Sequence, residues 1–304
     1  MGIASFNELE KKVIDSKRKF RVAVANAGDS HSIEAIMLAV DKGFAEPVLV
    51  GDKDAIVKIL GEMGRTVPEE NIYDCPDVTE AVAKAVELVR KGKADFLMKG
   101  KLDTSALLKG VVKSGTGLND GNLMSALFIA AIPGYHKLVA VVDGGMLTYP
   151  SLEQKKALIN NTVHAFHCLG CENPKVGVLA CIEKVNPKMP ETVEAAELKR
   201  MNEEGEITGC FVEGPISYDC AMSPASAKEK DFNSPAAGDC DILIAPNIHA
   251  ANILSKALTV TCKAESAGCI IGAKCPVVIS SRGSSPEEKC NSIMLAVAVV
   301  LGEK

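Results

Sequence analysis

The sequence contains no tryptophan, and aromatic residues make up only 4% of its 304 residues. Proteins that bind single-stranded nucleic acid by base stacking need aromatic side chains beside basic grooves, so this scarcity argues against that class. The formal net charge of -5 also argues against it, because nucleic-acid backbones bind basic surfaces. We therefore expect no nucleic acid among the partners of this protein.

Long apolar runs are missing as well. Even residues 293–301 are too few to cross a bilayer, and residues 1–20 carry charges where a secretory signal needs a continuous apolar stretch. The eleven cysteines are odd in number and scattered, which favours reduced thiols over a disulfide framework. These observations predict a cytoplasmic protein that does not associate with membranes.

The sequence repeats one unit, in which a short β-rich segment is followed by a turn of small residues and a helical segment. This pattern predicts an α/β fold with parallel strands and crossover helices. Hydrophobic residues account for 47% of the chain, enough to bury a core in each of two domains. The expected strands cover residues 22–25, 47–50, 71–74, 94–98, 137–142, 176–180, 210–213, 242–245 and 276–280.

The pattern restarts with a helix at Ser151, which divides the chain. We expect a first α/β domain at residues 1–144 and a second at residues 145–274, and the closing segment at residues 275–304 could belong to either. Ligands of open parallel sheets bind beyond the carboxyl ends of the strands. An active site in the cleft between the two domains is therefore expected.

Two lysines flank a glycine directly after an expected strand, in the turn Lys99-Gly100-Lys101, and Thr104 follows closely. Glycine lets the backbone approach a phosphate group, and the lysines neutralise its charge. A solvated surface turn is the alternative. Small and hydroxyl residues at 26–32 could hold a second anion or only cap a helix.

Later turns carry further candidates for substrate binding. Asn186 and Lys188 offer an amide and a cation just before a helix that begins at Pro190. Asp219 could act as an acid or a base, or it could cap the segment that follows. Asn252, at the start of an expected helix, is a further candidate.

The last turn leads from Ser281 and Arg282 into a C-terminal helix. Ser285 as N-cap, Pro286 at the first helical position and Glu288 at the third make a complete capping box. Capping does not require Arg282, whose guanidinium could hold a phosphate or a carbonyl oxygen.

Histidines and cysteines cluster near the end of the helix that starts at Ser151. Their spacing matches no standard zinc finger, so we expect a helix end and no metal site. The residues are His164, His167, Cys168 and Cys171.

Taken together, these motifs resemble those of the phosphate acetyltransferase and phosphate butyryltransferase family, nearest the butyryl branch, over almost the whole chain. The Asn-Pro-Lys-Met-Pro run at 186–190 and the Ser281-Arg282 turn are the most specific matches. Others lie at residues 97–100 with 103–104, 132–135, 213–215, 241–246, 272–274 and 287–288.

The resemblance implies two doubly wound domains of the isocitrate/isopropylmalate dehydrogenase-like type in a homodimer. It also implies that the C-terminal segment returns to the first domain, which would then comprise residues 1–144 plus 275–304. It implies acyl-CoA, acyl phosphate and inorganic phosphate as partners, with coenzyme A as a substrate and no bound metal or redox cofactor. A CoA thiolate would attack the carbon of a butyryl or acetyl group. Ser281 would stabilise the thiolate, Arg282 would hold phosphate or the acyl oxygen, and Glu288, where Asp is usual, would remove the thiol proton.

Asn119 and Asn122 stand where the butyryl branch commonly has arginines. These differences favour an alternative, in which the chain is a catalytically impaired relative that binds CoA or acyl ligands as a partner or regulator. The retained Ser281 and Arg282 oppose it. A third hypothesis, a metal-dependent dehydrogenase on the related fold, would need a metal cluster and a nucleotide site, and the sequence assembles neither.

Overall fold

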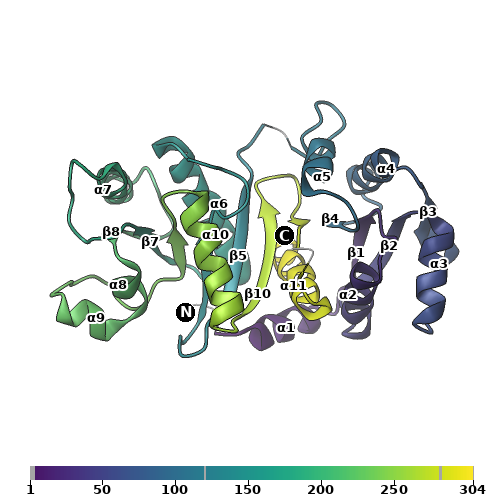
Figure 1. The fold of residues 1–304 in the computed structure, drawn as a ribbon, viewed down its shortest axis with the longest axis horizontal. Helices are drawn as coiled ribbons and strands as arrows, with labels where there is room; N and C mark the ends of the chain where they lie inside the picture. Colours follow the sequence, from purple (N-terminus) through teal and green to yellow (C-terminus); the bar gives the residue numbers. More distant parts are fainter. Residues whose placement is uncertain (1–3, 120, 281–282, 304) are drawn as a thin grey trace. The chain divides into compact units, whose positions relative to one another are not determined.

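The protein is an α/β protein that divides into two compact units (Figure 1). Unit 1 comprises the chain up to Glu8 together with residues 123–266, and unit 2 comprises residues 9–122 and the chain from Ala267 onward. The computed structural model describes residues 4–119, 121–280 and 283–303.

The bounds of the units differ from the domains expected from the sequence. Residues 123–144 fold with unit 1, and residues 267–274 fold with unit 2. In unit 1, β5 (Ser125–Ala131) pairs with β6 (Leu138–Val142), which pairs in turn with β9 (Ile242–Ile244). β6 and β9 are distant in sequence, so hydrophobic periodicity alone does not reveal their pairing.

The strands of unit 2 follow the order β3-β2-β1-β4-β11-β10. β1 lies between β2 and β4 and is parallel to both, so the direction of winding reverses between β1 and β4. Doubly wound sheets bind ligands at such a reversal. The strands are β1 (Phe20–Ala25), β2 (Ala45–Gly51), β3 (Ile72–Asp74), β4 (Phe96–Lys99), β11 (Val277–Val278) and β10 (Glu265–Ile271), which begins at the end of unit 1.

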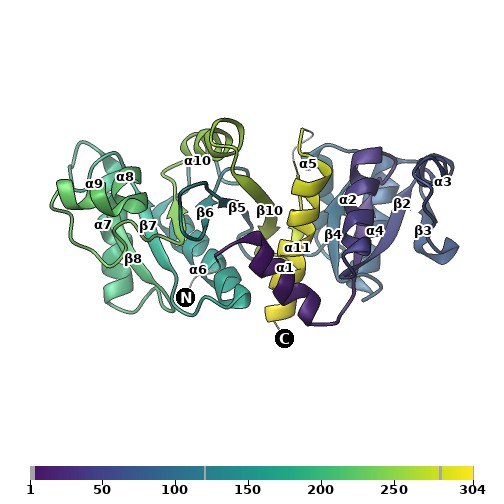
Figure 2. The ribbon, with the colours of Figure 1, turned by 90° about the horizontal axis from the view of Figure 1, so that it is seen from below.

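Helices cover this sheet. α2 and α11 pack against each other (Figure 2), whereas α4 packs against β1, β2, β4 and α5. Residues 293–300 of α11 are all buried, which explains the apolar run in this part of the helix. The helices are α1 (Phe6–Asp15), which crosses the boundary between the units, α2 (Ser30–Asp41), α3 (Lys53–Glu62), η1 (Glu69–Asn71), α4 (Val78–Arg90), α5 (Thr104–Val111) and α11 (Pro286–Gly302).

The strands of unit 1 follow the order β5-β6-β9-β7-β8, with β7 (Lys175–Leu179) and β8 (Phe211–Ile216) at one edge. α7 packs against β8 (Figure 1), and α10 packs against β6. The helices are α6 (Leu152–Leu169), α7 (Pro190–Glu203), α8 (Tyr218–Met222), α9 (Pro224–Glu229), α10 (Ile248–Lys256) and the π-helical turn η2 (Ala257–Thr261).

All nine expected strands are present, but β5 and β10 were not expected. Both lie in antiparallel pairs, β5 with β6 and β10 with β11. The parallel arrangement predicted from the sequence holds for pairs such as β1–β2 and β1–β4 but not for these two. The α/β class is confirmed. An antiparallel pair needs no crossover helix, so the strand–helix rhythm that indicated the other strands gives no signal for these two.

Unit 1 contains a buried charge network where β6 begins. Lys137, whose side chain is 8% exposed, places its ammonium 2.9 Å from Asp239 Oδ1 and 2.8 Å from Asp241 Oδ1. Lys175 donates its backbone N–H to Asp241 and pairs its ammonium with Asp239. Burial alone would raise the pKa of Asp239, but hydrogen bonds from Lys175, Lys137 and His136 outweigh it and hold that pKa well below its usual range.

All eleven cysteines are thiols. Burial raises the pKa of Cys240, Cys269 and Cys275 to about 12, whereas Cys181 and Cys262 are exposed. No helix in the described part of the chain is long and apolar enough to cross a membrane.

Candidate active site

Two turns of unit 2 lie side by side at the carboxyl ends of β1 and β4. Gly100 N–H donates to Ala25 O (2.9 Å) and Lys101 N–H donates to Asn26 O (2.8 Å). Asn26 Nδ2 donates in return to Lys101 O at 2.5 Å. These bonds fix the position of the turn that carries Lys99 and Lys101.

Gly100 is required by this packing. A Cβ at Gly100 would lie 2.3 Å from Asn26 O and 2.6 Å from Ala25 O, far inside van der Waals contact. The sequence correctly indicated a close approach of backbone at Gly100, but the structure shows that the approaching group is the neighbouring turn. A phosphate ligand is not needed to explain this glycine.

A pocket of about 550 Å³ opens beside the two turns, at the reversal of the strand order, and we call it the lysine pocket. Three lysines, two aspartates and one histidine contribute to its lining. The complete lining consists of Asp29, His31, Ser32, Val78, Lys99, Gly100, Lys101, Leu102, Asp103, Ala106, Ser280 and Lys289.

Three of the predicted phosphate-binding residues, Lys99, Gly100 and Lys101, line this pocket. Lys99 is only 7% exposed, and its ammonium donates to Leu102 O at 3.1 Å. Lys101 is exposed. Thr104 is the first residue of α5 and lies beside the pocket without lining it.

The turn at 26–32 caps a helix, as its structural alternative predicted. Asp29 Oδ1 accepts the N–H of Ser32 at 2.9 Å and so caps α2. Asp29 Oδ2 is buried and has no hydrogen-bond partner within the described residues. Asp29, His31 and Ser32 also line the lysine pocket, so the same turn borders the candidate site.

Ser281 and Arg282 lie outside the described residues, directly after Ser280 of the pocket lining. The capping box that starts α11 is confirmed. Glu288 N–H donates to Ser285 Oγ, and Ser285 N–H donates to Glu288 Oε2, both at 3.2 Å. The role of Glu288 as a base stays a prediction.

The remaining candidates belong to unit 1, where each stabilises a turn. Asn186 Oδ1 accepts the N–H of Lys188 at 3.0 Å, which shapes the turn before α7 and leaves the Lys188 side chain exposed. Asn252 Nδ2 donates to Gly144 O at 3.0 Å, which ties α10 to the turn after β6. Substrate binding by these residues stays a prediction.

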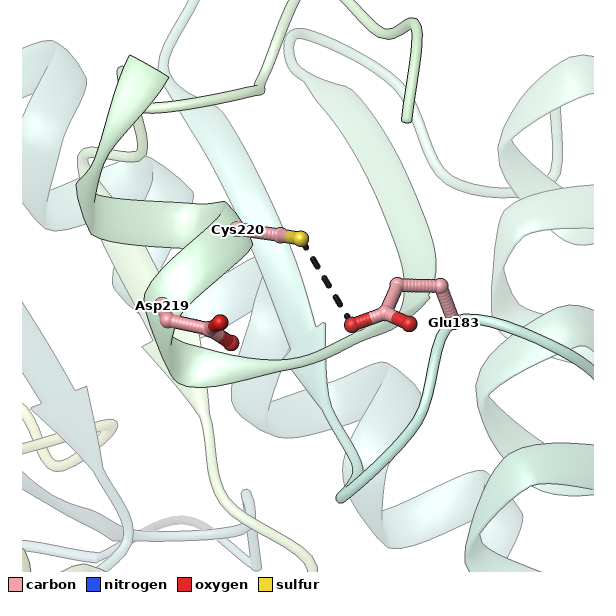
Figure 3. Close-up of side chains that lie close together, drawn as sticks. All are labelled: Glu183, Asp219 and Cys220. Carbon is pink, nitrogen blue, oxygen red and sulfur yellow. Dashed lines mark hydrogen bonds between the residues drawn. The ribbon is translucent and has the colours of Figure 1, made fainter. Parts of the chain in front are cut away.

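Asp219 belongs to a charged cluster that includes Glu183 and Cys220 (Figure 3). Within the described residues, these three side chains lie close enough together to hold a metal ion. The Lys230 ammonium, however, lies 3.0 Å from Glu183 Oε1 and 2.9 Å from Asp219 Oδ2. Because Lys230 forms ion pairs with both carboxylates, their proximity is explained without a metal.

The protonation of this cluster argues against acid chemistry at Asp219. Hydrogen bonds from Ser217 and then Lys230 lower the pKa of Asp219 to about 2. Burial raises the pKa of Glu183, but the bonds from Ser217 and Lys230 outweigh it and the net shift is downward. Both groups are therefore carboxylates at neutral pH, and Asp219 is too weakly basic for efficient proton abstraction.

A second pocket, of about 320 Å³, lies in unit 1 at the carboxyl ends of β7 and β9, and we call it the apolar pocket. It borders the turn of Asn186 and Lys188 through Met189. Its lining contains one charged side chain. The lining consists of Leu179, Ala180, Cys181, Met189, Glu191, Thr192, Tyr218, Ala245, Pro246, Ala250 and Leu254.

Several residues of these sites were not predicted from the sequence, among them Lys289, Glu183 and Lys230. Lys289 had a detectable signal, because it is a lysine on a helix whose other residues are mostly apolar. Glu183 and Lys230 are 47 positions apart and meet only in the folded chain, so no local pattern indicates their pairing.

Comparison with solved structures defines the class of this fold. A branched-chain phosphotransacylase from Enterococcus faecalis V583 matches with a TM-score of 0.81 and 28% sequence identity, over 92% of this chain and 99% of that one. The fold of this chain is thus shared with a phosphotransacylase.

Sequence comparison gives the family. Residues 74–297 match the model described as Phosphate acetyl/butaryl transferase. Phosphate butyryltransferase of Clostridium acetobutylicum is 42% identical over 302 residues, 99% of this chain and 100% of the relative. Phosphate acetyltransferase of Thermotoga maritima is 45% identical over 289 residues, 95% of this chain and 98% of the relative. The chain belongs to the phosphate acetyl/butyryltransferase family and is an acyltransferase of the phosphotransacylase type, as its motifs predicted.

Proposed function

We propose that this chain exchanges phosphate and coenzyme A on a short acyl group, butyryl or acetyl. The observation that carries the proposal is the full-length similarity to phosphate butyryl- and acetyltransferases, and the lysine pocket adds physical support. Lysines and a helix N-terminus at the carboxyl ends of parallel strands suit the phosphate group that such a reaction takes up or releases.

In the proposed reaction, Glu288 removes the proton of the CoA thiol and the thiolate sulfur bonds to the acyl carbon. The bond between that carbon and the phosphate oxygen then breaks, and inorganic phosphate leaves. Ser281 stabilises the thiolate, and Arg282 holds phosphate or the acyl oxygen, whose negative charge grows during attack. Lys99, Lys101, Asn186, Lys188 and Asn252 bind the substrates.

We also propose the finer assignments that the resemblance implied: two doubly wound domains of the isocitrate/isopropylmalate dehydrogenase-like type, assembled as a homodimer in the cytoplasm. The strand order of unit 2 supports the doubly wound type, and the thiol state of the cysteines supports the cytoplasm. Coenzyme A acts as a substrate, and no metal or redox cofactor takes part. The active site in a cleft between the domains stays a prediction.

The test is turnover by the purified full chain. Butyryl phosphate and acetyl phosphate are each supplied with CoA, and formation of the thioester and release of phosphate are followed together. We expect CoA-dependent turnover with at least one substrate, and Arg282→Ala should abolish it in a folded protein. If no short acyl phosphate reacts while CoA still binds, the impaired relative that binds CoA becomes the better description.

Glu288→Gln tests the base separately from the fold. The amide oxygen of Gln can still accept the Ser285 N–H, and the bond from the residue 288 N–H to Ser285 Oγ is unaffected. We expect unchanged thermal stability and a loss of kcat of about a hundredfold or more, as for removal of a general base. Glu288→Ala is the matched variant that also weakens the cap. If Glu288→Gln keeps full kcat, Glu288 is only a helix cap.

A further inference from the structure

Lys289 is a buried lysine in the first turn of α11, with 6% of its surface exposed, and it lines the lysine pocket. None of the motifs that indicated the function includes it. Lysine is almost never this deeply buried unless its ammonium is paired, because removing a charge from water without compensation is costly. The Lys289 ammonium therefore needs either a partner within the protein or a bound ligand.

Within residues 4–119, 121–280 and 283–303, no acceptor lies within hydrogen-bond or ion-pair distance of the Lys289 ammonium. The other buried lysines differ in this respect. Lys137 and Lys155 each contact a carboxylate, and Lys99 donates to a backbone carbonyl. Among these four lysines, only Lys289 has an ammonium that faces a pocket and contacts no carboxylate or carbonyl oxygen of the described residues.

The other charges of the pocket do not remove this imbalance. Asp29 is held at the N-terminus of α2 by Ser32, and neither Asp29 nor Asp103 forms an ion pair with Lys289. Lys101 adds a third ammonium to those of Lys99 and Lys289. Three lysines against two aspartates leave the lining with an excess of one positive charge, which favours the binding of an anion such as a phosphate group.

We propose that Lys289 binds a phosphate group of a substrate in the lysine pocket. The inference deepens the proposed function and rests on it, because it takes the phosphate from the substrates of that reaction. The group belongs either to inorganic phosphate and acyl phosphate or to coenzyme A. Lys289 donates charge-assisted hydrogen bonds to its oxygens, and the ligand supplies the negative charge that the fold does not.

The variant Lys289→Met removes the charge and keeps the length of the buried stem and the helix propensity. We expect the affinity for the phosphate-bearing substrate to fall about tenfold or more, as for loss of a hydrogen bond to a charged group. Thermal stability should be unchanged or higher, because an unpaired buried charge has been removed. A lysine that stabilised the fold would give the opposite change in stability. Lys289→Arg should restore part of the affinity.

Lys109→Met is the matched control, since Lys109 is an exposed lysine on α5 of the same unit. KM values for inorganic phosphate, acyl phosphate and CoA are measured for wild type and both variants. If only the KM values for inorganic phosphate and acyl phosphate rise, the ligand is the transferred phosphate. If only the KM for CoA rises, the ligand is a phosphate group of CoA. Unchanged KM values for all three in folded Lys289→Met overturn the proposal and leave the enzymatic function intact.

Calorimetric titration with inorganic phosphate and with CoA, in the absence of a second substrate, separates this inference from the reaction itself. If the wild type turns over no acyl phosphate, the proposed function fails, but the titration still decides the role of Lys289. Binding that is about tenfold weaker in Lys289→Met supports it. Equal binding by both proteins, or no binding of either ligand by the wild type, overturns it.

Discussion

The two units differ in whether the charge of a buried lysine is neutralised by the protein. In unit 1, Lys137 lies between the carboxylates of Asp239 and Asp241, and its charge is neutralised inside the fold. In unit 2, Lys289 is equally buried and faces a pocket without a protein counterpart within the described residues. The same residue type at the same depth therefore serves two purposes.

The paired Lys137 is expected to stabilise the fold, whereas the unpaired Lys289 is expected to bind a ligand. A neutralised buried lysine is costly to remove, because its carboxylates are left without compensation. An unpaired one lowers stability and is retained where function requires it. Substitution of lysine by methionine therefore has opposite expected effects on stability in the two units, and the following experiments test that contrast.

Lys137→Met is expected to have the largest effect on stability. It leaves Asp241, whose side chain is 4% exposed, without its ammonium partner, and removal of one member of a buried pair costs about 3 kcal/mol or more. Urea unfolding measures the free energy. Lys91→Met, at an exposed pair with Glu87, is the control and should change it little. If Lys137→Met is as stable as Lys289→Met, the contrast between the units is wrong.

Gly100→Ala tests the packing of the lysine pocket itself. The new Cβ would overlap Asn26 O and Ala25 O, and relief of such overlap costs about 1–3 kcal/mol through backbone shifts. We expect lower stability together with weaker phosphate binding, because Lys99 and Lys101 would move. Gly61→Ala in α3 is the control, since nothing lies within 4 Å of its new Cβ, and it should stabilise the protein by about 0.5–1 kcal/mol. A neutral Gly100→Ala would show that the turn is not constrained by its neighbour.

Asp239→Asn is expected to have the smallest effect, a change in how strongly stability depends on acid pH. The pKa of Asp239 is lower in the folded protein than in the unfolded chain, so its contribution is present above about pH 4 and is lost as the pH falls further. The wild type should lose stability with acid more steeply than Asp239→Asn, which has no carboxylate to protonate. Thermal melts between about pH 2 and pH 6 measure both slopes. Equal slopes of stability against pH for the two proteins would contradict the lowered pKa of Asp239.

The repeated strand–helix pattern predicted the α/β class, nine strands and the start of α11, because each of these depends on local sequence. Ser285, Pro286 and Glu288 show why, since a capping box lies within a single helical turn. β5 and β10 could not be predicted in this way, because each lies in an antiparallel pair that has no crossover helix. The bounds of the two units depend on long-range strand pairs, such as β6 with β9.

The candidate site was predicted in part. Lys99, Gly100 and Lys101 line the lysine pocket, and their position after a buried strand was sufficient to indicate it. Lys289 reaches the same pocket from a helix about 190 residues later, and the absence of a counterion can be seen only in three dimensions. The ion pair of Asp219 with Lys230 also forms only in the folded chain and could not be predicted from the sequence, although the two residues are only 11 positions apart.

The unequal exposure of the thiols makes unit 1 accessible to chemical labelling without mutagenesis. Cys181 and Cys262 are on the surface, while burial keeps Cys240, Cys269 and Cys275 protonated at neutral pH. A maleimide fluorophore should thus attach chiefly at two positions, one of which borders the apolar pocket. The emission of a dye at Cys181 would then respond to any molecule that enters that pocket, which gives a direct optical assay for its occupants.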